Sequence, residues 1–181
     1  MDRPEACDVH GVSDVGLIRE NNQDQFLVAD LCKSMVITRT SLPMEDQARL
    51  HGTLKGQLLV VADGLGGHVA GDKASALVIR TVSEYVLNTV HCFCRLECDE
   101  DELRSELEAA FHKAQAALEQ EGRDRPEREG MGTTLTMAYV MWPRMYLVHA
   151  GDSRAYVCRH GSLSQVTRDH TLMQEMIDLG A

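Results

Sequence analysis

The chain has 181 residues, of which 44% are hydrophobic and 25% are charged, and this balance is typical of a folded domain rather than a disordered one. Its 18 basic and 28 acidic residues leave a net charge of −10, which argues against nucleic acid and anionic membranes as partners. No apolar run approaches the ~20 residues of a membrane span, and residues 1–5 do not resemble a secretory signal. We therefore expect a cytoplasmic domain of ordinary size without a membrane span.

Six cysteines occur in the chain, and without a secretory signal they are expected to be free thiols in a reducing compartment. Three of them, Cys92, Cys94 and Cys98, follow His91 closely enough to suggest a metal site. Their spacing, C-x-C-x3-C, is not a common zinc spacing, and no second cysteine pair accompanies it. Packed thiols are the favoured interpretation, and a metal ion at this cluster is the alternative.

The first third of the chain is predicted to consist mainly of strands. Short strands are expected at residues 9–14 and 26–30, and residues 35–38 are expected to extend the second of these or to form another. The polar stretch 39–56 predicts a loop. The apolar run 58–62 predicts a buried central strand that ends at the pair Asp63-Gly64.

Two helices and two hairpins are predicted next. Apolar residues recur at helical spacing over residues 72–86 and again over 103–118. Two pairs of strand-like segments, each joined by a short turn, follow at 133–141 with 145–150 and at 154–159 with 162–167. A short helix is expected at 171–179. Strands, then two helices, then hairpins favour an α+β layered sandwich of antiparallel strands over a doubly wound parallel sheet.

Three aspartates are predicted to lie where strands meet loops. Asp24 precedes a strand, whereas Asp63 and Asp152 each follow one. A carboxylate at the end of a buried strand costs free energy unless a positive charge meets it, so three such carboxylates suggest a shared site. Carboxylate oxygens without a histidine or cysteine cage favour hard cations such as Mg2+ or Mn2+. Ordinary turn or cap residues are the alternative interpretation.

Two further features lie near these aspartates in the sequence. The glycine-rich stretch 63–71 leads into a helix, but its spacing is neither a Walker A loop nor a dinucleotide-binding fingerprint. A tight turn that holds Asp63 is therefore the simpler interpretation. Arg19 lies in the polar stretch before the second strand, and its planar guanidinium suits a phosphate group. A surface ion pair is the more ordinary role for a single loop arginine.

Several short motifs occur in a definite order along the chain. They are Ser13-Asp14-Val15-Gly16, Asn22-Gln23-Asp24, Val61-Ala62-Asp63-Gly64, Gly132-Thr133-Thr134, Gly151-Asp152-Ser153-Arg154 and Asp169-His170. Together they resemble the motifs of the metal-dependent protein phosphatases, the protein phosphatase 2C-like (PPM) family, in its bacterial form. Each motif alone is weak, but the ordered set extends over residues 12–170 and is specific.

The resemblance implies an α-β-β-α sandwich of two antiparallel sheets flanked by helix pairs. It also implies a protein serine/threonine phosphatase that works with two Mn2+ or Mg2+ ions, to which bacterial members add a third. In such an enzyme Asp63 would bridge the two ions, the Gly64 carbonyl would bind one of them, and Asp24 would hold metal-bound water. Asp152 would help to bind the third ion.

The resemblance implies roles for further residues around the substrate. Arg19 would hold the substrate phosphate, and the segment Gly132-Thr133-Thr134 would support the site. His68 is a candidate proton donor. Water is the alternative donor, because Leu65 stands directly after the Asp-Gly pair, where eukaryotic members have a histidine. The metals would lower the pKa of a bridging water and offset the added charge, so no protein nucleophile is needed.

The family pattern also includes a later Asp-Gly and a final Asp-Asn, whose carboxylates complete the first metal site. No Asp-Gly follows residue 64, and no Asp-Asn occurs in the chain. Residues 1–181 are therefore expected to be one phosphatase domain that is truncated at its C-terminus. Phosphoprotein substrates, a cognate Ser/Thr kinase as partner and a monomeric state are the corresponding expectations. The alternative is an inactive fragment or pseudophosphatase that binds a phosphoprotein or another partner.

Overall fold

The computed structural model describes residues 8–39, 41, 43, 49–65, 70–90 and 99–180, with the backbone alone for residues 53–55. Its elements, in chain order, are β1 (Asp24–Val36), β2 (Arg49–Leu65), α1 (Ala70–Thr89), α2 (Glu100–Asp124), the 3-10 turn η2 (Pro126–Arg128), β3 (Gly132–Thr133), β4 (Leu135–Met141), β5 (Arg144–Ala150), β6 (Tyr156–Arg159), β7 (Ser162–Gln165) and α3 (Leu172–Asp178). None of the helices in these ranges is long and apolar enough to cross a membrane.

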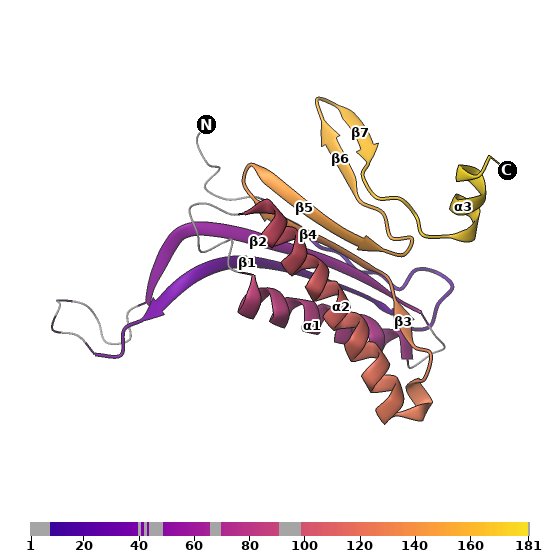
Figure 1. Cartoon of the computed structure of the whole chain (residues 1–181), viewed down its shortest axis with the longest axis horizontal. Coiled ribbons are helices and arrows are strands. Elements are labelled where there is room, and N and C mark those ends of the chain that lie inside the picture. The colour runs from indigo at the N-terminus through magenta and orange to yellow at the C-terminus, as the bar shows by residue number, and fades with distance from the viewer. Residues whose placement is uncertain are drawn as a thin grey trace.

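The strands form two antiparallel sheets. The larger sheet has the order β1-β2-β4-β5, with β3 added to the end of β2, and the smaller one is the hairpin β6-β7. Helices α1 and α2 lie side by side across one face of the larger sheet (Figure 1). The predicted α+β class and the antiparallel sheets are confirmed. Within the described ranges, the helices that cover the larger sheet are this one pair.

The core lies between the larger sheet and the two long helices. Its buried side chains are Leu31, Leu58, Val60, Ala62, Val78, Ile79, Val82, Val86, Val90, Leu103, Leu107, Ala110, Ala114, Leu135, Met137 and Tyr139. The helical periodicity read from the sequence is confirmed, because the buried positions of α1 and α2 repeat every three to four residues. Each large aliphatic side chain buried in this way stabilises the fold by ~1.5–3 kcal/mol.

The apolar run 58–62 is central in the sheet, as predicted, but it is not buried on both faces. Leu58 and Val60 are 1% exposed, whereas Val61 is 47% exposed. Alternate side chains of a strand point to opposite faces, and only one face of this sheet is covered by helices among the described residues. The run 58–62 is therefore buried on one face alone, although all five of its residues are apolar.

Two boundary predictions were wrong. Residues 9–14 form no strand; instead, the Asp14 carboxylate accepts a hydrogen bond from the Gly16 N–H (2.7 Å), and such local side-chain bonds compete with strand pairing. Part of the predicted loop 39–56 belongs to β2, where His51 and Leu50 pair with Ser34 and Met35 of β1. This arm of the β1-β2 ladder projects beyond the helices (Figure 1) and is held by backbone pairing without burial, so it carries no apolar periodicity.

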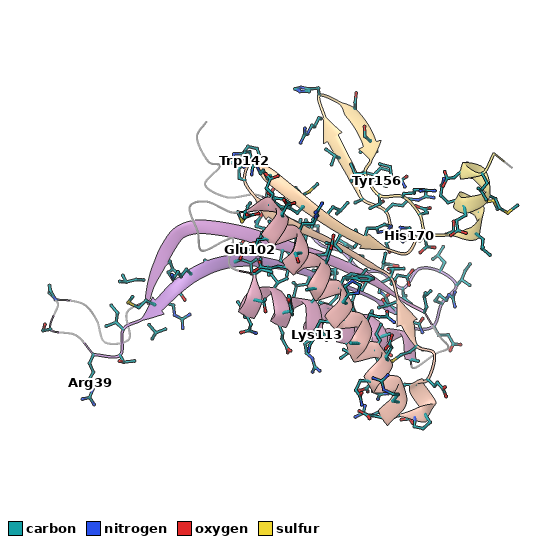
Figure 2. All side chains as sticks on the ribbon, viewed as in Figure 1. Arg39, Glu102, Lys113, Trp142, Tyr156 and His170 are labelled. Atoms are coloured by element: carbon teal, nitrogen blue, oxygen red, sulfur yellow. The ribbon has the colours of Figure 1, made fainter. Side chains whose placement is uncertain are left out.

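The later elements agree with the sequence reading. The α2 helix begins after Asp99, whose carboxylate accepts hydrogen bonds from the N–H groups of Asp101 and Glu102. The hairpins β4-β5 and β6-β7 and the short helix α3 lie within one or two residues of their expected bounds. Trp142, in the turn between β4 and β5, and His170 lie at opposite ends of β5 (Figure 2). The cysteine cluster at residues 92–98 lies outside the described residues, and Cys32 and Cys158 are exposed free thiols.

Candidate metal and phosphate site

The β1-β2 ladder brings two of the predicted aspartates face to face. Asp24, the first residue of β1, pairs in register with Asp63, near the end of β2. Side chains that are directly opposed in an antiparallel pair lie about 5 Å apart at Cβ, so the two carboxylates share one space. They line a cavity of about 540 Å³ together with Gly64 and residues of the 14–24 segment, among them Arg19. The structure therefore brings together four of the residues predicted for the site.

The surroundings of Asp63 shift its pKa. Burial raises the pKa of Asp63 above its usual value, and the neighbouring Asp24 raises it further through repulsion and a side-chain hydrogen bond. Asp152 adds a smaller repulsion, whereas Arg19 acts in the opposite direction. A site with this excess of negative charge is a place where a bound cation would be stabilised.

The segment Gly132-Thr133-Thr134 holds the backbone of Asp63 in place. The Thr134 N–H donates to the Asp63 carbonyl (2.8 Å), and the Asp63 N–H donates to Thr134 Oγ1 (2.9 Å). The Thr133 hydroxyl donates to the same Asp63 carbonyl at 2.8 Å, next to the short β2-β3 pairing. The structure thus places this segment against the Asp63 backbone, and its supporting role in a metal site stays a prediction. The segment fixes the direction from which the Asp63 carboxylate enters the cavity.

The glycine-rich turn after Asp63 is a close backbone crossing. A Cβ atom added at Gly64 would lie 2.1 Å from the Gly71 carbonyl oxygen, so no larger residue fits there. The Ser75 hydroxyl, fully buried on α1, donates to the Gln23 carbonyl at 2.7 Å, and the Gly64 N–H reaches the same carbonyl at 3.3 Å. The start of α1 is thereby attached to both strands that carry the carboxylates. The sequence reading gave Ser75 no role; a serine on the apolar stripe of a helix was the available signal.

Asp152 lies on a loop that is fastened to the segment after β7. The His170 N–H donates to the Gly151 carbonyl (2.8 Å), and the Arg154 guanidinium donates both Nε and Nη2 hydrogens to the Asp169 carboxylate at 2.6–3.1 Å. The Arg154 hydrogen bonds lower the pKa of Asp169. Gly151 has a φ of +113° and would clash with Thr134 if it carried a Cβ. Asp152 itself is exposed, and it does not line the cavity of Asp24 and Asp63.

A second contact fastens the same loop. His149 Nε2 lies 3.1 Å from the Arg168 carbonyl, which only accepts, so Nε2 carries the proton and the Thr136 hydroxyl donates to Nδ1 (2.9 Å). Motif reading placed Asp169 and His170 in the family pattern but did not reveal these contacts, because their partners are 15 to 19 residues away.

The donor set suits a hard divalent cation in part. Asp24, Asp63 and the Gly64 carbonyl offer oxygen atoms at one place, which is the chemistry that Mg2+ and Mn2+ prefer. Within the ranges that the structure describes, no group of three or more His, Cys, Asp or Glu side chains gathers closely enough to hold a metal ion. The predicted proton donor, His68, lies outside the described residues. Its role stays a prediction.

Comparison with known proteins decides the family. Residues 37–176 match the family model described as Protein phosphatase 2C. The chain belongs to the protein phosphatase 2C family. The resemblance read from the ordered motifs is thereby confirmed.

Individual members of the family agree. The chain is 35% identical over 170 residues to the serine/threonine protein phosphatase PstP of Mycobacterium tuberculosis, covering 93% of this chain and 26% of that protein. It is 34% identical over 123 residues to the serine/threonine phosphatase stp of Listeria welshimeri, covering 68% of this chain and 47% of the relative. The PstP catalytic domain crystallised with two manganese ions superposes with a TM-score of 0.68 at 34% identity, over 93% of this chain and 58% of that one. The chain thus spans about a quarter to three fifths of the relatives it matches.

Proposed function

We propose that this chain forms part of a protein serine/threonine phosphatase that hydrolyses phosphoserine and phosphothreonine with a water activated at a binuclear Mn2+ or Mg2+ centre. The observation that carries the proposal is the register pair Asp24–Asp63, which opposes two carboxylates in a cavity that also contains Arg19. The two manganese ions of the PstP structure support the choice of metal. Phosphoprotein substrates, a cognate Ser/Thr kinase among the partners, and a monomeric cytoplasmic enzyme belong to the same proposal.

The residues of the cavity divide into two roles. Asp63, Asp24 and the Gly64 carbonyl would hold the ions, with Asp152 as a ligand for a third. Bound divalent ions would lower the pKa of a water molecule and offset the charge of the phosphate ester. Arg19 would hold phosphoryl oxygens with its planar fork of N–H donors and so orient the phosphorus atom toward the water. His68 remains the candidate proton donor to the leaving oxygen, with water as the alternative.

The backbone around Asp63 makes this arrangement rigid before any ligand binds. Both the N–H and the carbonyl of Asp63 are hydrogen-bonded to Thr134, and Gly64 packs directly against Gly71. Groups that are already oriented cost little reorganisation when charge develops in the transition state. The carboxylate and the neighbouring carbonyl would therefore present their oxygens in a fixed geometry.

The metal ligands described here are fewer than a binuclear centre needs. Two opposed carboxylates and one carbonyl leave coordination positions open, and the chain spans only 58% of the PstP domain. We therefore include in the proposal that the remaining ligands come from a C-terminal segment outside these 181 residues. The same observation favours the second candidate function, in which the 181-residue chain alone binds phosphoproteins without hydrolysing them.

The test is hydrolysis of a phosphoserine peptide with Mn2+, measured for the 181-residue chain and for the complete reading frame that contains it. We expect turnover by the longer protein, much weaker turnover by the shorter one, and loss of turnover in the variant Asp63→Asn of the longer one. The loss should reach about 100-fold or more, since even outer-shell changes at metal sites cost about 10- to 100-fold. Asp30→Asn is the matched control, because Asp30 is an exposed β1 carboxylate outside the cavity.

Metal binding is measured separately by the electron paramagnetic resonance of free Mn2+. Asp63→Asn should weaken binding and Asp30→Asn should not. Turnover that does not need a divalent ion, or an Asp63→Asn variant with normal turnover, would contradict the mechanism. Equal activity of the two chain lengths would contradict the missing-ligand part alone.

A further inference from the structure

A second concave region lies between the two long helices. It is a groove of about 390 Å³, which we call the basic groove, and its lining residues are Lys73, Ala76, Leu77 and Arg80 of α1 with Glu121, Arg125 and Arg128 at the end of α2 and in η2. Four of these seven residues are basic and one is acidic, in a chain whose net charge is −10. The groove is therefore a positive region on a protein that is otherwise strongly negative.

The nearby acidic side chains neutralise the groove only in part, since three carboxylates pair with its four basic groups. Within the lining, the single carboxylate of Glu121 meets two guanidinium groups, since Arg125 donates to it at 2.8 Å and Arg128 donates to the same oxygen. Outside the lining, Lys73 lies 3.4 Å from Asp72. The Lys73–Asp72 pair is exposed and therefore weak, whereas the Arg128–Glu121 pair is partly buried, with side chains 22% and 25% exposed.

Arg80 is in a similar position to Lys73. Its nearest carboxylate, Glu84, is 3.9 Å away, and both side chains are about 70% exposed. Arg80 thus retains hydrogen-bond donors for a further anion. Together with Lys73 it gives α1 two cations that face the end of α2.

Helix stability explains only half of this arrangement. Arg125 and Arg128 follow the C-terminal end of α2, where positive charge is favourable because of the helix dipole. Lys73 lies in the first turn of α1, where a cation is unfavourable. Basic residues from both helices nevertheless face one groove, which points to an anionic ligand.

The basic groove and the candidate metal site lie on opposite sides of the first turn of α1. Gly71 packs directly on Gly64 of the cavity, whereas Lys73, two residues later, leaves the helix on the other side, so about one helix diameter of ~10 Å separates the two regions. Figure 1 shows the end of α2 at the same end of the molecule as β3, which pairs with Gly64. A peptide whose phosphorylated residue occupies the cavity could therefore reach the groove with residues a few positions away.

We propose that the basic groove binds an anionic group, phosphoryl or carboxylate, on the peptide segment that flanks the phosphorylated residue of a substrate. The identity of the ligand as a substrate segment rests on the proposed function. Guanidinium forks match carboxylate and phosphate oxygens, and the negative charge of the remaining surface repels an acidic peptide from other positions. The protein thus selects substrates that carry a second anionic group near the phosphorylated residue.

The experiment measures binding without turnover. Fluorescent peptides carry a non-hydrolysable phosphonate in place of phosphoserine, followed by a flank with glutamates, a second phosphoserine or neutral residues. Dissociation constants come from anisotropy in metal-free buffer. The test variant is Arg80→Gln/Arg125→Gln, and the control is Arg104→Gln/Arg159→Gln, which changes the net charge equally at exposed positions outside the groove.

The groove variant should bind the acidic flanks about fivefold more weakly, because each exposed charge pair contributes a fewfold in affinity. The control should change this affinity less than twofold, and the neutral flank should bind both variants alike. The glutamate and phosphoserine arms show which anion is preferred. Melting temperatures of both variants should match that of the unaltered protein, which establishes that the fold is intact.

Equal affinities of the groove and control variants for the acidic peptides would overturn the inference, as would an equal loss with the neutral flank. Groove-dependent binding by a protein that hydrolyses no phosphopeptide would support the groove and contradict the proposed activity. Normal hydrolysis with no preference for acidic flanks would support the proposed activity and contradict the role of the groove.

Discussion

The cavity of Asp24 and Asp63 and the basic groove lie on opposite sides of the first turn of α1 and are built differently. The carboxylates of the cavity are fixed by backbone register, by the hydrogen bonds of Thr134 and by the contact of Gly64 with Gly71. Three of the four basic side chains of the groove, which come from α1 and from the segment directly after α2, are half exposed or more. A region defined by the backbone should respond sharply to single substitutions, whereas one defined by mobile side chains should respond gradually and depend on salt.

The largest expected difference concerns metal binding. Saturating Mn2+ should stabilise the unaltered protein, by ~2.7 kcal/mol when its concentration is a hundred times the dissociation constant. Asp63→Asn should abolish most of this stabilisation because it removes a ligand charge. Arg80→Gln/Arg125→Gln should keep it in full. Thermal unfolding with and without Mn2+ measures the effect, and a groove variant that loses the Mn2+ response would remove the distinction between the two regions.

A second difference concerns the hydrogen bond from Asp63 to Thr134, compared with a hydrogen bond outside the cavity. Thr134→Val should cost about 2 kcal/mol in the free energy of unfolding, because it leaves the Asp63 N–H without its acceptor. It should also weaken the Mn2+ response, since Asp63 is then free to shift. Thr136→Val, which removes a hydrogen bond to His149, is the matched control. Denaturant unfolding at several Mn2+ concentrations distinguishes the two; equal Mn2+ responses would contradict a specific role for Thr134.

Salt should affect the groove more than the cavity. Raising ionic strength from 0.1 to 1 M shortens the Debye length from about 10 Å to about 3 Å. The affinity for an acidic peptide should then fall roughly threefold or more, because the groove charges are solvent-exposed. Mn2+ affinity should fall less, because direct coordination at a partly buried site is screened less. Parallel titrations at the two salt concentrations provide the measurement, and the opposite order would count against the contrast.

The smallest expected effect is on the stability of the metal-free protein. Because the pKa of Asp63 is raised in the folded state, the folded protein holds the proton more tightly, and stability falls as pH rises from the ordinary pKa of 3.8 through the raised pKa. Asp63→Asn should therefore be more stable than the unaltered protein near pH 7, by less than about 1 kcal/mol for a largely solvent-screened group. The gain should vanish at pH values low enough to protonate Asp63. A gain that does not depend on pH would show that neither burial of the charged carboxylate nor repulsion from Asp24 is its cause.

Sequence reading located the cavity well because its residues are close to motifs and strand ends. Asp24, Asp63 and Arg19 were each placed by the type of residue and by its neighbours in the chain, and the structure brings them together. The order of the motifs was informative, because it linked residues that are far apart in the sequence to a single site. The helices could also be predicted, because burial of one helix face makes apolar residues recur with a period of about 3.6 residues.

Two kinds of feature escaped the sequence. Residues 49–52, at the start of β2, pair with β1 at exposed positions, so their side chains follow no burial pattern. The basic groove joins Lys73 to Arg128, which are 55 positions apart, and no local signal reports that convergence. Tertiary proximity between unpatterned surface residues has to be observed.

The loop that carries Asp152 is expected to open slowly. Its attachment to the segment after β7 includes backbone hydrogen bonds from His170 to Gly151 and from Val166 to Ala155, besides the Arg154–Asp169 fork. The backbone at Asp152 cannot shift unless several of these contacts break at once. Such openings are local unfolding events, which are far slower than rotamer changes. Hydrogen exchange at the His170 and Val166 amides should accordingly proceed as one cooperative, slow unit and so report how long the Asp152 loop stays closed.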